Sequence, residues 1–320
     1  MTSPVISLKH TFVLQIDKNM KSIIITGANS GIGYECAVQM AKIAPKESII
    51  IACRNMTAGK LAAEKIKKET GHPNLVCMEL DLASLQSIRA FEIAFSKTDH
   101  KEISALINNA GLQNIGETAY TKDGFEITFG TNHLGGLYLT QLLTPYMTSG
   151  ASVTFTASDT HDPLTKTGIE PPVYTSGREL AFPTKTTEKA TTVGQRRYST
   201  SKLCNVMTAY LFHEKLAPLG IRVNAFDPGM VPGTGLAKNY PAILRFVWNN
   251  IMPVLTYFKK NTNTAVLSGG RLANLAYSKK YADLNGIYFS DGEVTKSSTD
   301  SYNKKFQTEL WNSSIELLNG

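Results

Sequence analysis

Several features are scarce in this sequence of 320 residues, and each scarcity excludes a class of protein. Cysteine occurs only four times and never as a CxxC pair, so neither a disulfide framework nor a structural zinc site is expected. Each cysteine sits inside an apolar run, which indicates buried thiols in a reducing compartment. These cysteines are Cys36, Cys53, Cys77 and Cys204. We predict no metal site.

Long apolar runs are also missing. No stretch reaches the roughly 18 uncharged apolar residues that a membrane-spanning helix needs. Residues 241–258 come nearest, but Arg245, Asn249 and Pro253 interrupt them. We interpret them as one or two short helices over a pocket, with attachment to a membrane surface as the less favoured alternative. The first twenty residues lack a signal-peptide pattern. We therefore expect a cytoplasmic protein, with a membrane-peripheral position as the alternative.

Acidic residues are outnumbered, with 26 Asp and Glu against 33 Lys and Arg, and the net charge is +7. The basic residues are scattered along the chain, and no zinc-finger, RNP or basic-arm motif accompanies them. We therefore expect no nucleic-acid partner. An anionic cofactor or an acidic surface would account for the same excess of positive charge.

The apolar residues form an alternating pattern of strands and helices. Buried strands are expected at residues 22–26, 48–53, 75–80, 103–107, 151–156, 221–226 and 286–290. Helices are expected from residue 31 onward and at residues 57–70, 85–95, 123–146, 198–216 and 262–277. This alternation predicts right-handed βαβ units, and hence an α/β fold with one doubly wound, Rossmann-type parallel sheet covered by helices on both faces. No linker divides the chain, so residues 1–320 are expected to form a single domain, with a long insert at 161–195.

A glycine-rich turn follows the first strand and opens the first helix. Gly27, Gly31 and Gly33 let the chain turn sharply and bring backbone N–H groups, including those of Ser30 and Ile32, close to a pyrophosphate. The positive end of the following helix points at the same anion. The position of the turn in the first βαβ unit therefore predicts a dinucleotide site.

The second strand ends in Cys53-Arg54-Asn55. An acidic residue at this place would hold the adenosine ribose hydroxyls and favour NAD, whereas an arginine can pair with a 2′-phosphate. With Ser30 offering a further hydroxyl, Arg54 and Asn55 favour NADP(H) over NAD(H). The alternative is that Arg54 is only a solvated charge after a strand.

Three motifs together carry a family resemblance. The glycine spacing is GxxxGxG, Asn108-Asn109-Ala110-Gly111 follows the fourth strand, and Tyr198-Ser-Thr-Ser-Lys202 lies further on. In this order and over roughly residues 20–315, the chain resembles the short-chain dehydrogenase/reductase family. The family fold agrees with the sheet predicted above.

Tyr198 and Lys202 lie four residues apart on one helix face, so their side chains can approach one site. A phenol with a pKa of about 10 is a poor base at neutral pH, and a neighbouring ammonium lowers that pKa. The resemblance implies that Tyr198 is the general acid/base and that Lys202 tunes it and binds the nicotinamide ribose. It also implies that Ser158 polarises the substrate oxygen and that Asn132 holds a relay water. The neighbouring His133 is interpreted as structural.

The resemblance implies further cofactor contacts. Asp81, with Leu82, would hold the adenine, and other contacts would line the middle and the nicotinamide side of the cofactor. These are Asn109, Ala110, Gly111, Pro228, Gly229, Val231 and Thr234. The chain departs from the common pattern because Gly233 stands where a threonine is usual, with Thr234 one place later.

The segments ACRN, DLAS, GTNHLG and SKLCN resemble the branch of retinol dehydrogenases and light-dependent protochlorophyllide oxidoreductases. The resemblance implies an NADP(H)-dependent oxidoreductase that moves hydride between the nicotinamide and a carbonyl or alcohol carbon of a hydrophobic substrate. The insert at 161–195 and an apolar lid at 238–260 would form the pocket walls. The alternatives are reduction of a carbon–carbon double bond and a non-catalytic NADP(H)-binding protein. A homo-oligomer stays open, since the insert and the tail at 301–320 could block its contacts.

Overall fold

The computed structural model describes residues 20–234 and 261–320, so the predicted lid at 238–260 lies outside the described residues. The described chain contains one eight-stranded sheet in the order β3-β2-β1-β4-β5-β6-β7-β8. All neighbouring strands run parallel except the last pair, β7 and β8. The strands are β1 (Ser22–Thr26), β2 (Ser48–Cys53), β3 (Leu75–Glu79), β4 (Ile103–Asn108), β5 (Met147–Thr156), β6 (Arg222–Asp227), β7 (Tyr288–Ser290) and β8 (Glu293–Thr295). The predicted α/β fold with a doubly wound parallel sheet is confirmed.

The central strands are buried on both faces, which explains why they read as continuous apolar runs. Ile23 and Ile25 of β1 are fully buried on one face of the sheet, and Ile24 is fully buried on the other. Ile23 lies in register with Ile49 of β2, so isoleucines face isoleucines across the ladder. This core fixes the carboxyl ends of the strands at one edge of the sheet, where the site lies.

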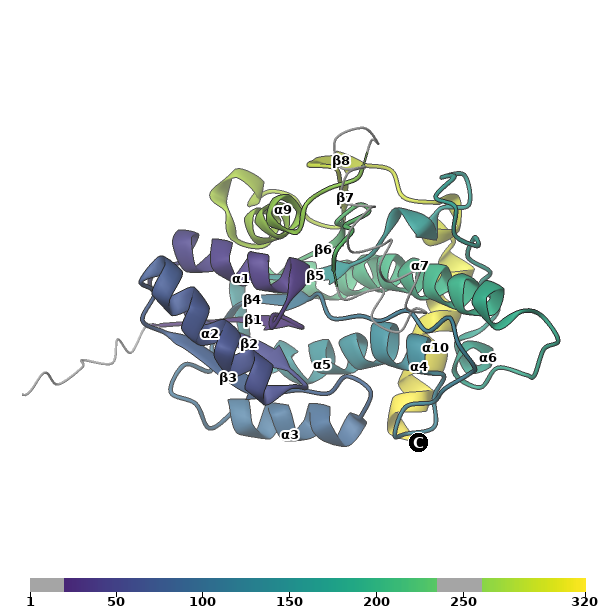
Figure 1. The fold of residues 1–320 in the computed structure, drawn as a ribbon, viewed down its shortest axis with the longest axis horizontal. Coiled ribbons are helices and arrows are strands. Elements are labelled where there is room, and N and C mark those ends of the chain that lie inside the picture. The colour runs from purple at the N-terminus through teal and green to yellow at the C-terminus, as the bar shows by residue number, and fades with distance from the viewer. Residues whose placement is uncertain (1–19, 235–260) are drawn as a thin grey trace, which may run out of the picture.

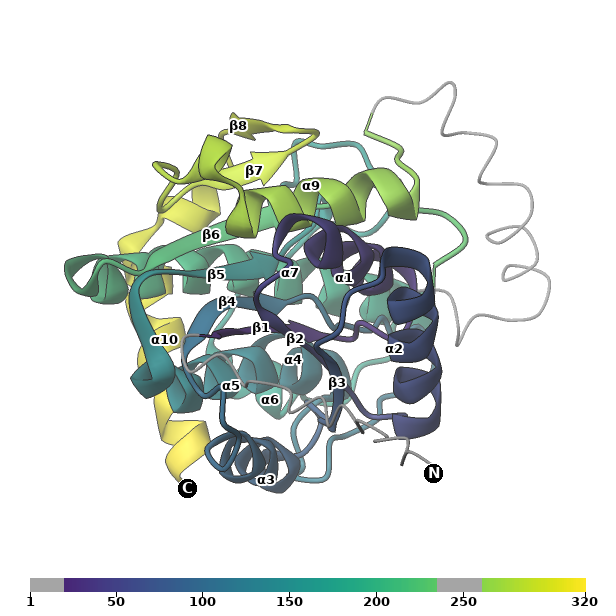
Figure 2. The same cartoon turned by 90° about the vertical axis from the view of Figure 1, so that its left-hand side faces the viewer.

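Helices cover both faces of the sheet (Figures 1 and 2). α1 (Gly31–Ile43), α2 (Met56–Thr70) and α9 (Ala265–Tyr277) pack on one face, and α3 (Leu85–Phe95), α5 (Gly135–Leu143) and α7 (Ala190–Leu216) pack on the other. α9 lies directly against α1, although more than 200 residues separate them. A Cβ on Gly269 of α9 would lie 2.6 Å from Glu35 Cβ of α1, so the two helices pack closely. The helix that follows the glycine turn is therefore held in place by α9.

Several element boundaries differ from those predicted. The helix expected at 123–146 begins with α4 (Ile127–Phe129) and passes through a π-helix, Gly130–Leu134, before α5. The helix expected at 198 begins at Ala190, so Tyr198 lies more than two turns inside it. The insert at 161–195 is correspondingly shorter as a loop, and it contains the short helix α6 (Gly177–Ala181).

The expected C-terminal tail is a helix, α10 (Lys304–Asn319), that lies across α7 (Figure 1). Leu310 and Leu318 are buried, and the Trp311 ring meets the Phe212 ring edge-on at 5.3 Å between centroids. Apolar or small residues recur every four positions from Phe306 onward, which is the spacing of one helix face. The C-terminal segment therefore belongs to the core.

The four cysteines are free thiols. Cys36, Cys53 and Cys204 are buried as predicted, whereas Cys77 is only partly buried, and burial raises the pKa of each thiol. None of the helices in residues 20–234 and 261–320 is long and apolar enough to span a membrane.

Candidate active site

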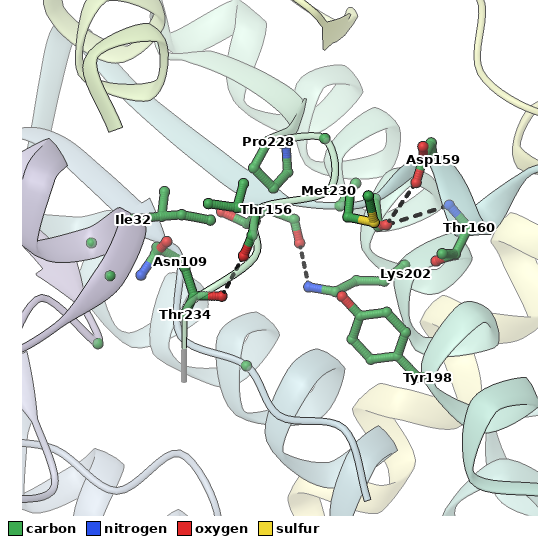
Figure 3. Close-up of a pocket in the computed structure, with 18 of the residues that line it drawn as sticks. Ile32, Asn109, Thr156, Asp159, Thr160, Tyr198, Lys202, Pro228, Met230 and Thr234 are labelled. Atoms are coloured by element: carbon green, nitrogen blue, oxygen red, sulfur yellow. Dashed lines mark hydrogen bonds between the residues drawn. The ribbon is translucent and has the colours of Figure 1, made fainter. Parts of the chain in front are cut away.

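A cavity of about 360 Å³ opens at the carboxyl ends of β1, β4, β5 and β6. The glycine turn and Ser158 both line it. Figure 3 shows Ile32, next to the glycines, on one side and Tyr198 and Lys202 on the other. The structure thus brings most of the predicted site residues together around one space. Those that line it are Gly27, Ser30, Gly31, Ile32, Gly33, Asn109, Ala110, Gly111, Ser158, Tyr198, Lys202, Pro228, Gly229, Val231 and Thr234.

The glycine turn has a geometry that only glycine accommodates readily. Gly27 and Gly31 have φ of 69° and 58°, in the left-handed region. A Cβ on Gly33 would lie 2.5 Å from Asn109 Nδ2 and 2.7 Å from the Gly27 carbonyl oxygen. The backbone at the start of α1 is therefore packed as closely as it can be against the ends of β1 and β4.

The start of α1 also fits the predicted cofactor. The side chain of Ser30, at its N-cap, makes no capping hydrogen bond, whereas Asn55, Ser84 and Thr264 cap α2, α3 and α9 with their side chains. The first N–H groups of a helix need an acceptor. At α1 these groups face the cavity, which suits the pyrophosphate of a dinucleotide.

Thr26 is a structural residue of this end that the sequence reasoning missed. Its hydroxyl oxygen accepts hydrogen bonds from the backbone N–H groups of Asn109 and Ala110, both at 2.9 Å. Asn109 Nδ2 donates in return to the Thr26 carbonyl oxygen at 2.8 Å. These bonds tie the end of β1 to the end of β4, and the threonine directly before the first glycine was the available signal.

Lys202 and Tyr198 lie side by side on α7, as their spacing predicts. The ammonium nitrogen of Lys202 is 5.5 Å from the centre of the Tyr198 ring and donates a hydrogen bond to the Thr156 carbonyl oxygen at 3.0 Å. Lys202 is 4% exposed, and burial lowers the pKa of its ammonium to about 8, against the opposing effect of the negative charge on Asp227. The arrangement keeps a cation beside a phenol at neutral pH.

Ser158 stands just beyond the carboxyl end of β5 and faces the same cavity. Its hydroxyl donates to Asp159 Oδ1 at 3.2 Å and accepts from the backbone N–H of Thr160 at 3.3 Å (Figure 3). The hydroxyl therefore already has a donor behind it. A substrate oxygen that took the place of the Asp159 acceptor would accept the hydrogen bond of the Ser158 hydroxyl.

Asn132 lies in the π-helix behind the cavity and does not line it. Its Oδ1 accepts from the Leu112 N–H at 2.8 Å, and its Nδ2 donates to the Leu112 carbonyl oxygen at 2.8 Å and to Ser201 Oγ at 3.0 Å. Gly111 separates the amide from Lys202, since a Cβ there would lie 3.2 Å from Asn132 Oδ1 and 3.5 Å from Lys202 Nζ. The relay-water role stays a prediction.

His133 is buried next to Asn132 but has different partners. Its ring bonds Ser314 Oγ of α10 at 2.9 Å and Thr208 Oγ1 at 3.3 Å, and burial lowers the pKa of the imidazole to about 3. The geometry agrees with the structural interpretation, because His133 joins α10 to α7.

Four predicted cofactor residues do not line the cavity: Arg54, Asn55, Asp81 and Leu82. Arg54 is exposed, and Asn55 caps α2 by accepting from the Ala58 N–H at 3.0 Å. Asp81 Oδ1 accepts from the Ala83 N–H at 3.1 Å, and its Oδ2 lies 3.5 Å from Lys122 Nζ. Leu82 is buried. The cofactor roles of these residues stay predictions.

Asp159 and Asn261 line the cavity beside Ser158 and were missed from the sequence. Asn261 has a φ of 54°, and its Nδ2 donates to Asp159 Oδ2 at 3.0 Å and to Asp227 Oδ2 at 3.1 Å. Three segments far apart in the sequence meet in this cluster. No local motif connects these three residues in the sequence. The available signal for the cluster was Asp227, directly before Pro228-Gly229.

Comparisons with known proteins agree with this geometry. Residues 21–176 match the short chain dehydrogenase family, and residues 235–319 match the AcuH dehydrogenase domain. Retinol dehydrogenase 12 of Mus musculus is 31% identical over 304 residues, which cover 93% of this chain and 86% of that protein. Chloroplastic protochlorophyllide reductase of Daucus carota is 32% identical over 286 residues, which cover 84% of this chain and 69% of that protein.

A solved structure shares the fold. It is a short chain dehydrogenase from Burkholderia cenocepacia J2315 in complex with NADP, with a TM-score of 0.63 and 18% identity over 85% of this chain and 96% of that one. The fold and the relatives define an oxidoreductase. The chain belongs to the short-chain dehydrogenase/reductase family, in the branch of retinol dehydrogenases and protochlorophyllide reductases.

Proposed function

We propose that the chain is an NADP(H)-dependent oxidoreductase that transfers hydride between the nicotinamide and a carbonyl or alcohol carbon of a hydrophobic substrate. One observation carries this proposal. Ser158, just beyond β5, and Tyr198 and Lys202 of α7 face the same cavity as the glycine turn. A serine hydroxyl, a phenol and a buried ammonium around one space are the groups that carbonyl reduction needs.

Each side chain has a distinct task. When bound, the nicotinamide supplies the hydride chemistry. The Ser158 hydroxyl donates to the substrate oxygen where negative charge develops, and its partner Thr160 N–H keeps the hydroxyl oriented. Tyr198 passes the proton to that oxygen, and the Lys202 cation favours the phenolate that results.

Preference for NADP(H) is supported by Arg54. The guanidinium is exposed just past the carboxyl end of β2, next to the N-terminus of α2, where an adenosine 2′-phosphate would carry negative charge. A bidentate arginine–phosphate contact is among the strong charge-assisted hydrogen bonds. Ser30 of the glycine turn lines the cavity and offers a further hydroxyl.

A hydrophobic substrate is supported by the cavity wall and by the relatives. Ile169 of the insert and Met230, which follows β6, add apolar surface to the end that holds Tyr198. The names of the relatives, retinol dehydrogenase and protochlorophyllide reductase, specify large apolar molecules. The second of these names keeps reduction of a carbon–carbon double bond as a second candidate.

The proposal is tested by turnover of the purified chain with NADPH or NADH. The probes are all-trans-retinal and nonanal in the dark, and protochlorophyllide in light and in the dark. We expect aldehyde reduction with NADPH, at a higher kcat/KM than with NADH. Light-dependent turnover of protochlorophyllide alone would favour the second candidate. Tight NADPH binding with no turnover of any probe would contradict both.

Replacement of the acid/base residue gives the sharpest test of mechanism. Tyr198→Phe should lower kcat by about 10²- to 10⁴-fold, since the proton donor is lost, while the Kd for NADPH stays within about threefold. Tyr277→Phe is the matched control. Tyr277 lies at the end of α9 and donates a hydrogen bond to Glu47, which directly precedes β2 and so lies at the edge of the sheet opposite the cavity. Retained turnover in Tyr198→Phe would contradict the assignment.

A further inference from the structure

His161 is a buried imidazole directly behind the catalytic serine. It is 1% exposed and its ring lies 4.8 Å from the Tyr288 ring, between centroids. Nδ1 lies 2.6 Å from the Ser158 carbonyl oxygen, and the backbone N–H of His161 donates to the same oxygen at 3.1 Å. Ser298 N–H donates to Nε2 at 3.0 Å. Because Nε2 accepts, the ring proton sits on Nδ1 and is donated to Ser158.

A series of buried hydrogen bonds continues from His161 to α10. Ser301 Oγ donates to the Ser298 carbonyl oxygen at 2.6 Å, and Gln307 Nε2 donates to the Ser301 carbonyl oxygen at 2.7 Å. Ser298, Ser301 and Gln307 are each at most 2% exposed. The catalytic serine is thus connected to the C-terminal helix through one imidazole.

We propose that His161 is a positioning residue that fixes the Ser158 hydroxyl against the substrate oxygen, and that α10 sets the position of His161. This inference rests on the proposed function, because it assumes that Ser158 polarises the substrate. Both bonds to the Ser158 carbonyl oxygen come from His161, so this residue fixes the turn that also aims the Thr160 N–H at Ser158 Oγ.

The bonding pattern explains why histidine is needed here. The site requires a donor toward Ser158 and an acceptor toward Ser298, on opposite sides of one flat ring. A neutral imidazole offers both, and burial lowers the pKa of His161, which keeps the ring neutral. Asparagine can place a donor near the Nδ1 position, glutamine can place an acceptor near the Nε2 position, and phenylalanine keeps only the ring over Tyr288.

Four variants separate these contributions, with all-trans-retinal and nonanal as probes. In His161→Phe and His161→Gln, we expect kcat to fall about 10- to 100-fold, because small misplacement of a polarising group is costly. His161→Asn should stay within about threefold of the parent, since the donor to Ser158 is restored. In all three variants, the KM and the Kd for NADPH should be unchanged. Equal losses in the Asn and Gln variants would overturn the proposal.

The fourth variant removes the α10 end of the connection. Ser298 has a φ of −59°, which proline adopts, so Ser298→Pro removes the N–H donor to Nε2 without imposing a new φ on residue 298. We expect kcat to fall about three- to tenfold in this variant, less than in His161→Phe, because the bond to Ser158 remains. An unchanged kcat would exclude α10 from the proposal.

A double-variant comparison distinguishes this inference from the proposed function. If His161 acts through Ser158, then Ser158→Ala with His161→Phe should be no slower than Ser158→Ala alone. Full activity of Ser158→Ala would contradict the proposed role of Ser158 itself. A slow Ser158→Ala together with a fully active His161→Phe would contradict only the inference.

Crystal structures decide the geometry independently of activity. In His161→Phe, the Ser158 hydroxyl should lose its bond to the Thr160 N–H, whereas His161→Asn should retain it. An unmoved Ser158 in His161→Phe would overturn the positioning role even if neither aldehyde were turned over.

Discussion

The two ends of the cavity are built in different ways. The glycine end is lined mainly by the backbone of one continuous stretch, from Gly27 to Gly33, where β1 passes into α1, and it is braced by Asn109 and Ala110 after β4. The serine end is made by side chains from the turn after β5, from α7 and from the segment after residue 260, and the backbone of Ser298 supports it through His161. The first end depends on local conformation, and the second depends on the whole fold.

This difference determines which changes each end tolerates. At the glycine end, a side chain added at Gly27 or Gly33 meets neighbouring backbone atoms, so a substitution there should destabilise the fold. At the serine end, loss or displacement of one side chain should lower turnover. The free energy of unfolding can rise at the same time, because burying a polar group for catalysis costs stability. Substitutions at the two ends should therefore move stability in opposite directions.

Lys202→Met should have the largest effect on turnover. Loss of the cation should lower kcat by about 10²- to 10⁴-fold, because the acid/base task of Tyr198 depends on it. The Thr156 carbonyl oxygen would still accept from Asn205 Nδ2, at 3.1 Å. Steady-state kinetics with NADPH and all-trans-retinal measure this loss, and a Lys202→Met protein with parental kcat would refute it.

The same variant should be more stable than the parent. A pKa lowered from 10.5 to about 8 means that the folded state disfavours the ammonium, at a cost on the order of 3 kcal/mol below pH 8. The cost is fully present below the folded pKa and is relieved as the pH rises from about 8 to 10.5. The gain in the free energy of unfolding should therefore shrink over this range, as urea titrations at several pH values can measure.

Gly33→Ala, at the glycine end, should lower the stability of the protein, whereas Lys202→Met should raise it. The new Cβ would meet the Gly27 carbonyl oxygen at 2.7 Å, so the turn must shift, at a cost of about 1 to 3 kcal/mol in the free energy of unfolding. The Kd for NADPH should rise as well. Gly270→Ala on α9 is the matched control: a Cβ there meets nothing within 4 Å, so this variant should be slightly more stable than the parent. Equal stability of the two variants would contradict the close packing of the turn.

Arg54→Ala tests whether a side chain near the glycine end also contributes to cofactor binding. A lost charge-assisted contact to the 2′-phosphate should raise the Kd for NADPH about 10- to 100-fold and leave the Kd for NADH unchanged. Arg178→Ala controls for the change in net charge, because Arg178 is exposed and lies beside Glu316 of α10. A parallel loss of both cofactors, measured by fluorescence titration, would rule out a specific phosphate contact.

The sequence predicted the parts of the molecule that are local. Buried strands such as Ser22–Thr26 are continuous apolar runs, and the glycine turn and the Tyr198–Lys202 pair are short motifs, so each is visible without a partner. α10 was not predicted because its sequence is polar overall, and Leu310 and Leu318 acquire a core only when α7 lies beneath them. His161 and Asn261 were missed as site residues because their roles are set by contacts with Ser298 and Asp227, far along the chain.

Asn55→Ala should have the smallest effect. Loss of the side-chain cap of α2 should lower the free energy of unfolding by about 1 kcal/mol. Asn55→Asp keeps the cap but adds a negative charge beside Arg54, so it should retain stability and bind NADPH more weakly. Thr57→Ala, exposed in the first turn of the same helix, is the control. If Asn55→Asp binds NADPH as the parent does, Asn55 lies away from the cofactor phosphate.

The position of α10 has a consequence for the order in which the protein matures during synthesis. The glycine turn and the strands beside it are synthesised early, whereas Ser298, Ser301 and Gln307 follow much later in the chain. The bonds that reach Ser158 through His161 therefore cannot form until residues 298–307 have left the ribosome. Synthesis thus provides the residues of the glycine turn well before the residues that support the serine.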